Sequence, residues 1–417
     1  MVLFRHIPFL RTVFFYTLTA FGGPQSHYGM MIKNFSQKNN YVTEEELTDY
    51  FSLCQLLPGP SSTQTITLIG YKRGGVPLAL LTLLIWMLPA CFFMGCFSFL
   101  ITTDIDHLFN KKDIFHYLQP MTIGFLLYSS LRFYKTSVNN LVTGLIFFGS
   151  ILATYLLFRT PWVFPILLFC GGFITNLSDK RIPERDVITR RQIKWRNIWL
   201  FIGIFAVAGI LSETSRKNAW PERKAFNLFE NFYRFGSIVF GGGDVLLPMM
   251  LDQYVVRPDA PRVKIKNPNA LRMDKEQLLM GYGIVRAIPG PVFSVASYSG
   301  GIILKDGGLT RQALGCVIGS VAIFLPSTLL LFFFFPVWQN LKKYVVVYRA
   351  LEGIYAVVTG FMFAGAIYLL THAGFFTTPS INWPGATVVA ATTLLLLFTK
   401  IPPPLLVFST LLLGWIF

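Results

Sequence analysis

Long stretches without charged residues constrain this chain more than any other feature. Residues 77–100, 141–158 and 315–337 contain no Asp, Glu, Lys or Arg, and residues 345–370 contain two. Only 13% of the whole chain is charged, about half of what a soluble domain carries. A helix needs about 20 apolar residues to cross a bilayer, so these stretches predict membrane-spanning helices. A shorter uncharged stretch at 386–398 indicates another span.

The pattern predicts an all-α, multi-pass integral membrane protein with broken or re-entrant helices and about 10–12 spanning or half-spanning segments. The lipid bilayer is therefore an expected partner, and the plasma membrane is the expected location. Two segments leave the count open. Residues 198–211 can cross the bilayer or lie at its surface, and residues 44–70 can form a re-entrant hairpin. The sequence leaves a homodimer open.

Basic residues gather in the middle of the chain. The formal net charge is +16, and seven Lys or Arg residues lie between positions 180 and 196. Basic loops beside spanning helices favour the cytoplasmic side of a membrane, so we expect this loop there and no nucleic-acid partner. The expected organisation is a first transmembrane repeat (1–178), a basic central loop (179–196) and a second transmembrane repeat (197–417).

The five cysteines are scattered through apolar segments without CxxC spacing, and the five histidines show no spacing typical of metal ligands. Small, buried packing residues are the better interpretation of such cysteines. We therefore expect no metal and no cofactor.

Internal repetition divides the chain into two similar halves. Four short motifs recur in the same order, the first two at an offset of 219 residues. Duplicated halves with interrupted apolar segments are typical of secondary transporters, in which two similar units exchange conformations. The halves can be inverted or parallel, depending on the number of crossings between them. The recurring pairs are Phe-Gly-Gly at 21–23 and 240–242, Met-Met at 30–31 and 249–250, Pro-Gly-Pro at 58–60 and 289–291, and Leu-Pro at 88–89 and 325–326.

The Pro-Gly-Pro motifs predict two helix breaks. Proline removes a backbone donor, and glycine opens the chain further. A half-helix that starts at Pro60 leaves free N–H groups and a positive dipole end facing the break, which suits an anion. An ordinary structural kink is the alternative. In the second copy Arg286 is either an anion ligand or half of a structural ion pair. The candidate residues of these segments are Pro58, Gly59, Pro60, Ser61, Ser62, Thr63, Gln64, Arg286, Pro289, Gly290, Pro291 and Ser294.

The Phe-Gly-Gly motifs lie late in apolar segments, where glycine permits close helix packing or marks a break. Asp244 is either a carboxylate near the membrane or a helix N-cap. His27 is either a proton-coupling group, with protons as coupling ions, or a buried histidine whose polar atoms are satisfied. The candidates here are Gly22, Gly23, Pro24, His27, Gly241, Gly242, Gly243 and Asp244.

Three segments carry a resemblance to a known family. FGGPQSHYGMM at 21–31, LPGPSSTQTITLIGY at 57–71 and FGGGDVLLPMM at 240–250 resemble the signatures of the chromate ion transporter family, in its two-domain (long-chain) form. The resemblance implies movement of chromate, with sulfate as the related anion, usually outward. It implies site roles for the Phe-Gly-Gly and Pro-Gly-Pro residues and for His27, Thr63 and Gln64. The second copy departs from it, having Ser294-Val295 at the positions of Thr63-Gln64.

The leading hypothesis is a secondary active carrier of a divalent oxyanion, with both Pro-Gly-Pro breaks facing one site. An anion channel could use the same helix ends. A membrane-embedded enzyme acting on lipid-linked phosphate would need clustered carboxylates or a metal site, and the sequence has no such cluster at a membrane boundary. We therefore expect a transporter and not an enzyme.

Overall fold

The computed structural model describes residues 4–102, 114–157, 160, 162–177, 196–267, 269–338, 345–372 and 383–416. All regular elements in these ranges are helical, as the sequence predicts. The expected basic loop falls outside the described residues except for Arg196, so the proposed repeat boundaries remain a prediction. Four described helices are long and apolar enough to cross a membrane: Ser61–Thr102, Asn197–Lys217, Leu309–Val337 and Val345–His372.

Local sequence signals set the helices of the first copy. Helix α2 begins with Pro24, which suits a first helical position. Helix α3 begins at a capping box in which Thr43 and Glu46 bond each other's backbone N–H groups. Helix α4 bends where Gly74 and Gly75 leave the helical conformation. The elements are α1 (Ile7–Thr19), α2 (Pro24–Met31), the π-helix η2 (Ile32–Gln37), α3 (Glu44–Leu56) and α4 (Ser61–Thr102).

The second copy repeats this order. Its π-helix η5 lies 219 residues after η2 at both ends. Because π-helices are rare and often mark functional sites, their recurrence supports the duplication independently of the motifs. The short helix α11 (Pro261–Lys266) lies in the loop that distinguishes the copies. The elements are α9 (Arg223–Ile238), α10 (Leu246–Met250), η5 (Leu251–Val256), α12 (Lys275–Ile284), α13 (Val295–Leu304) and α14 (Leu309–Phe334).

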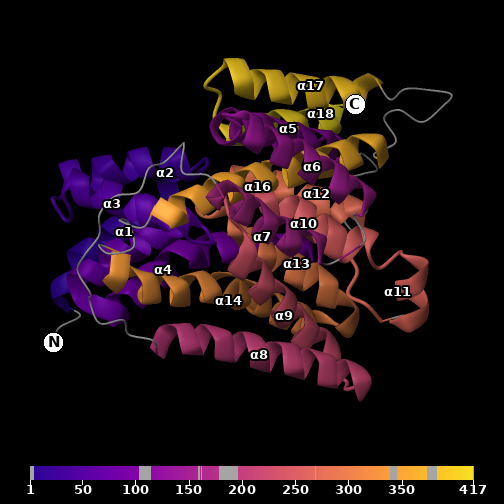
Figure 1. Cartoon of the computed structure of the whole chain (residues 1–417), viewed down its shortest axis with the longest axis horizontal. Helices are drawn as coiled ribbons and strands as arrows, with labels where there is room; N and C mark the ends of the chain where they lie inside the picture. Colours follow the sequence, from indigo (N-terminus) through magenta and orange to yellow (C-terminus); the bar gives the residue numbers. More distant parts are fainter. Residues whose placement is uncertain are drawn as a thin grey trace.

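Each copy ends in one long helix and two shorter apolar helices. Helix α8 (Arg196–Lys217) separates the copies and lies along one edge of the molecule, whereas α17 and α18 lie along the opposite edge (Figure 1). The closing helices are α5 (Leu118–Ser137), α6 (Leu141–Leu156) and α7 (Val163–Asn176) in the first copy, and α16 (Val345–His372), α17 (Trp383–Phe398) and α18 (Pro403–Ile416) in the second.

The second half of α4 corresponds to α14, and the two helices run antiparallel. Gln312 Nε2 donates to Thr102 Oγ1 at 3.0 Å, and Ser98 Oγ lies 3.4 Å from Cys316 Sγ. Earlier residues of α4 therefore contact later residues of α14. Because these equivalent helices run in opposite directions, the pseudo-two-fold axis that relates the repeats is perpendicular to them. If these helices cross the bilayer, the two repeats are inverted, which the sequence alone left open.

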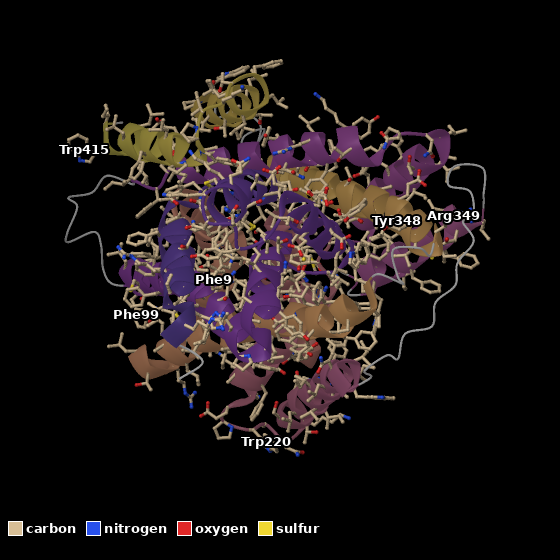
Figure 2. The ribbon with its side chains drawn as sticks, turned by 90° about the vertical axis from the view of Figure 1, so that its left-hand side faces the viewer. Phe9, Phe99, Trp220, Tyr348, Arg349 and Trp415 are labelled. Carbon is tan, nitrogen blue, oxygen red and sulfur yellow. The ribbon has the colours of Figure 1, made fainter. Side chains whose placement is uncertain are left out.

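The closing helices pack on the opposite copy. Gly171 of α7 meets Gly353 of α16 so closely that a Cβ on Gly353 would lie 1.9 Å from the Gly171 carbonyl oxygen. A closing helix of the second copy packs on the first copy in a similar way: Thr393 Oγ1 of α17 donates to the Gly124 carbonyl of α5 at 3.2 Å. Side chains fill the space between helices: Phe9 lies in the interior and Trp415 on the outside (Figure 2). The main hydrophobic core therefore contains side chains of both repeats.

Candidate functional site

Both Pro-Gly-Pro motifs break the helical path, and each is bonded to the opposite copy. The Gly59 N–H donates to the carbonyl of Val239 at 2.7 Å, and the Gly290 N–H donates to that of Ala20 at 2.9 Å. Val239 and Ala20 are the residues that precede the two Phe-Gly-Gly motifs. Each Pro-Gly-Pro break is therefore held against the Phe-Gly-Gly break of the other repeat.

Glycine is required at the centre of each Pro-Gly-Pro motif. Gly59 has φ +114° and Gly290 has φ +118°, values that side-chain-bearing residues rarely adopt. A Cβ on Gly59 would lie 2.4 Å from Cβ of Ser327, and one on Gly290 would lie 3.0 Å from Cβ of Ala90. Ser327 and Ala90 each follow the Leu-Pro motif of the opposite copy. The residue after each Leu-Pro motif thus contacts the Pro-Gly-Pro motif of the other copy across the pseudo-two-fold axis.

The four breaks surround one cavity of about 800 Å³. The helices α2 and α4 begin at its wall, so their first N–H groups lie at the cavity end of each helix. In the second copy the short 3₁₀ turns Gly243–Val245 and Val292–Ser294 occupy the matching places. The predicted site residues that line the cavity are Gly22, Gly23, Pro24, Gly59, Ser61, Gly241, Gly242, Gly243, Asp244, Arg286 and Gly290.

Other predicted site residues lie near the cavity but do not line it. Successive helical residues point in different directions, so Ser61 faces the cavity while Thr63 and Gln64 face the protein. Thr63 Oγ1 accepts a hydrogen bond from Trp86 Nε1 at 2.9 Å, and Gln64 Nε2 donates to the Pro58 carbonyl at 2.9 Å. The residues outside the lining are His27, Pro58, Pro60, Ser62, Thr63, Gln64, Pro289, Pro291 and Ser294.

Arg286 and Asp244 form an ion pair at the cavity wall. Ser129 Oγ donates to the second carboxylate oxygen of Asp244 at 2.8 Å, and the Arg286 guanidinium lies 5.2 Å from the centre of the Phe125 ring. Asp244 therefore uses its carboxylate on side chains and does not act as a helix N-cap. The structural ion pair weighed from the sequence is present, and Arg286 also faces the cavity.

The sequence interpretation missed two cationic residues of the cavity. Arg132 lies on α5 and Lys400 lies between α17 and α18, and both line the cavity. Arg132 gave the same signal as Arg286, a lone arginine in an apolar segment, whereas Lys400 gave none. With Arg286 they outnumber Asp244 by two charges among the described lining residues. The described lining of the cavity therefore carries a formal net charge of +2.

His27 lies on α2, and its carbonyl accepts a hydrogen bond from the Tyr16 hydroxyl at 3.1 Å. Its ring is 2% exposed and packs edge-on against Trp86 at 5.4 Å. The backbone of Ala20 interacts with the imidazole, although neither ring nitrogen has a hydrogen bond of ordinary geometry among the described residues. The two interpretations of His27, a proton-coupling group and a buried histidine whose polar atoms are satisfied, both stay predictions.

Two antiparallel repeats that meet at paired helix breaks around one polar cavity define a membrane transporter architecture. The sequence profile of the chromate transporter family matches residues 7–175 and 226–415, one region in each repeat. The chain belongs to the chromate transporter family. It is an integral, multi-pass membrane protein and a transporter, not an enzyme.

Three relatives are similar over most of their lengths. A chromate transport protein of Cupriavidus metallidurans is 22% identical over 402 residues, covering 95% of this chain and 89% of the relative. A probable chromate transport protein of Synechococcus elongatus is 22% identical over 419 residues, covering 97% and 94%. An uncharacterized transporter of Methanocaldococcus jannaschii is 22% identical over 352 residues, covering 84% and 81%. No solved structure matches this chain.

Proposed function

We propose that this protein is a secondary active transporter of divalent oxyanions, with chromate as its substrate and sulfate as a related one. The observation that carries the proposal is the shared cavity, whose described lining has two more positive than negative side chains. A dianion matches that excess. Two of the relatives are chromate transport proteins by name, one of them as a probable assignment.

The anion site has three kinds of donor. The first N–H groups of α2 and α4 supply partial positive charge at helix ends. Arg286 supplies a guanidinium, which suits oxyanion geometry. Hydroxyl donors come from Ser61 and Tyr128, which line the same wall. These groups surround an oxyanion without clustering several free arginines, so binding is reversible.

Binding competes with the internal ion pair. Asp244 already neutralises Arg286 in the cavity wall, so an arriving oxyanion exchanges with a carboxylate at the same guanidinium. Release restores the pair. This exchange keeps the arginine paired in both states, and the displaced Asp244 carboxylate keeps the Ser129 hydroxyl as a donor.

Outward movement follows from the membrane potential, because a negative cell interior repels an anion. A coupling proton is the second element of the proposal, with His27 as the candidate carrier because its imidazole is a buried titratable group behind the wall of Phe-Gly-Gly residues. The homodimer stays an open possibility that this function does not require.

The function is tested by radiolabelled chromate and sulfate uptake into proteoliposomes, with and without a proton gradient. A carrier gives saturable uptake and counterflow, while a channel gives single-channel currents and no counterflow. Failure of both anions to be taken up, or to compete, would refute the oxyanion proposal. A dependence of uptake on the proton gradient that persists in His27→Gln would remove His27 from coupling.

The site is tested by Arg286→Gln. Losing a charge-assisted hydrogen bond costs about 1.5–3 kcal/mol, so the KM for the anion should rise roughly ten- to a hundredfold. Arg132→Gln should raise it less, because Arg132 is exposed and water screens its charge. Arg216→Gln is the matched control, since Arg216 pairs with Glu213 at the end of α8, away from the cavity. An unchanged KM in Arg286→Gln would remove Arg286 from the site.

A further inference from the structure

The inner wall of the cavity obeys the pseudo-two-fold symmetry. Residues at equivalent positions of the Pro-Gly-Pro segments, 231 apart, line it in pairs. Both members of each pair line the cavity, so the two repeats contribute equally to this part of the lining. The pairs are Cys54 and Val285, Gln55 and Arg286, Leu57 and Ile288, Gly59 and Gly290, and Ser61 and Val292.

The outer wall breaks that symmetry. It is formed by the C-terminal part of α5 and by the junction between α17 and α18, where Leu396 and Thr399 line the cavity. The equivalent helices are α16 and the pair α6 and α7. Helices α6 and α17 both have 16 residues and begin 242 residues apart, so Thr154 corresponds to Leu396 and Leu157 to Thr399. Neither Thr154 nor Leu157 lines the central cavity.

Thr154 and Leu157 instead line a separate cavity of about 30 Å³, roughly the space of one water molecule. This small cavity lies between the junction of α6 and α7, helix α16, and the elements α9 and η5. Its wall on the second copy includes Arg234, Asp252, Gln253 and Arg257. The place equivalent to the open vestibule is thus almost closed, and it contains two arginines.

Close packing seals this place. The rings of Phe164 on α7 and Phe361 on α16 lie 4.3 Å apart, and both side chains line the small cavity. The contact between Gly171 and Gly353 holds the same two helices together. On the open side α18 touches α5 through Thr410 and Met121, at 3.2 Å. Helix α18 therefore packs less extensively on α5 than its counterpart α7 packs on α16, whereas α17 remains packed on α5 at Gly124.

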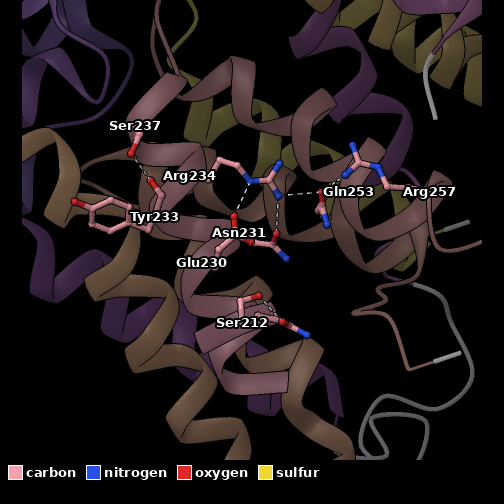
Figure 3. Close-up of polar contacts among 9 residues, drawn as sticks. Ser212, Glu230, Asn231, Tyr233, Arg234, Ser237, Gln253 and Arg257 are labelled. Carbon is pink, nitrogen blue, oxygen red and sulfur yellow. Dashed lines mark hydrogen bonds and ion pairs between the residues drawn. The ribbon is translucent and has the colours of Figure 1, made fainter. Parts of the chain in front are cut away.

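A polar network lines the sealed place (Figure 3). Arg234 donates to Glu230 at 3.1 Å, to Asn231 at 2.6 Å and to Gln253 at 3.2 Å. Arg257 donates to Gln253 and pairs with Asp252.

Three buried polar atoms around the small cavity remain without a hydrogen-bond partner in the described structure: Arg257 Nε, Asp252 Oδ1 and Thr154 Oγ1. Buried polar groups are seldom left unsatisfied in a purely structural network.

We propose that this sealed place is the second half of the anion pathway, closed in this conformation, and that Arg234 and Arg257 are its oxyanion-binding residues. The proposal rests on the proposed transport function. When the repeats exchange conformations, α7 loosens from α16 to the extent that α18 is now loosely packed on α5, and the vestibule at Leu396 closes. The anion then leaves past Thr154 on the opposite face of the membrane.

The chemistry of the two places agrees with this assignment. Arg286 in the open cavity is held by Asp244, and Arg257 in the sealed cavity is held by Asp252. In each, an oxyanion can exchange with the carboxylate at an arginine. The first copy has Lys33 at the position of Asp252 and Lys38 at that of Arg257, so this network belongs to the second copy alone.

The test compares the matched cysteines Thr154→Cys and Leu396→Cys. Both are placed in a chain whose five native cysteines are replaced and whose transport has been verified. A small anionic thiol reagent that does not cross the bilayer is added from either face of proteoliposomes. Transport is driven with whichever anion the wild-type protein carries. Samples without the thiol reagent measure how much of the cysteine thiol is oxidised by chromate itself.

At rest, Leu396→Cys should react from one face, while Thr154→Cys should be protected. During transport, Thr154→Cys should react from the opposite face about tenfold faster, because turnover populates a state that is minor at rest. Reaction from the same face as Leu396→Cys, or protection throughout verified transport, overturns the inference and leaves the transport function standing. A wild-type protein that carries neither anion refutes the proposed function instead.

If Thr154→Cys does not fold, the proposal is tested through Arg257, which lies on the opposite wall of the small cavity. Arg257→Gln provides a second readout. It should lower the transport rate at least several-fold while the anion still protects Leu396→Cys from the reagent. Transport equal to wild type in Arg257→Gln would overturn the role assigned to that arginine.

Discussion

Gly59→Ala gives the sharpest test of the crossed contacts between the repeats. Two costs add at this position. A side chain at φ +114° is strained by about 1–3 kcal/mol. The new Cβ would lie 2.4 Å from Cβ of Ser327, and overpacking of a close-packed interior costs about 1–3 kcal/mol more. We therefore expect Gly59→Ala to destabilise the fold by roughly 2–6 kcal/mol.

The second cost can be separated by a double-mutant cycle with Ser327→Gly. Removing Cβ of Ser327 restores the space but leaves the backbone strain at position 59, so the two changes should couple by about 1–3 kcal/mol. Ser327→Ala keeps Cβ and should give no such rescue. Gly29→Ala is the control, because Gly29 lies in α2 with open space around its missing Cβ and no positive φ.

The measurement is the unfolding midpoint of the purified protein in detergent, followed by tryptophan fluorescence and by size-exclusion chromatography. Gly59→Ala as stable as Gly29→Ala would refute the crossed packing of the Pro-Gly-Pro motif on α14. An absence of coupling with Ser327→Gly would assign the whole effect to the backbone.

Three further predictions use the same structure. Thr63→Val leaves the buried Trp86 N–H unpaired and should cost about 1–3 kcal/mol of stability, with an anion KM like that of wild type in the proteoliposome assay. Gly236→Ala should destabilise the contact of α9 with α14 by about 1–3 kcal/mol, measured by thermal unfolding, because its Cβ would lie 2.3 Å from the Ile323 carbonyl oxygen. Asp244→Asn should free Arg286 for the anion, lowering the KM and slowing release in counterflow; a raised KM would contradict the exchange of ligands at that arginine.

The sequence by itself determined the local features of this protein. Uncharged stretches fixed the helices that suit a bilayer, because backbone groups in lipid must be satisfied within the chain. Proline and glycine fixed where helices break, since their limits on φ and hydrogen bonding act within a few residues. The repeat was also readable, because its motifs keep their order. Ser61 and the Phe-Gly-Gly glycines, chosen from the sequence, line one cavity with Arg286, and their part in anion binding stays a prediction.

Tertiary structure decided how the two copies meet. The Gly59 N–H bonds Val239 and not a residue of its own repeat, a choice made by packing between segments far apart in the chain. The same packing pairs Arg286 with Asp244 and brings Lys400 to the cavity. It also turns Thr63 away toward Trp86. These contacts depend on the antiparallel arrangement of equivalent helices. That arrangement cannot be read from either copy by itself, because the local sequence pattern of a copy would be the same if the equivalent helices ran parallel.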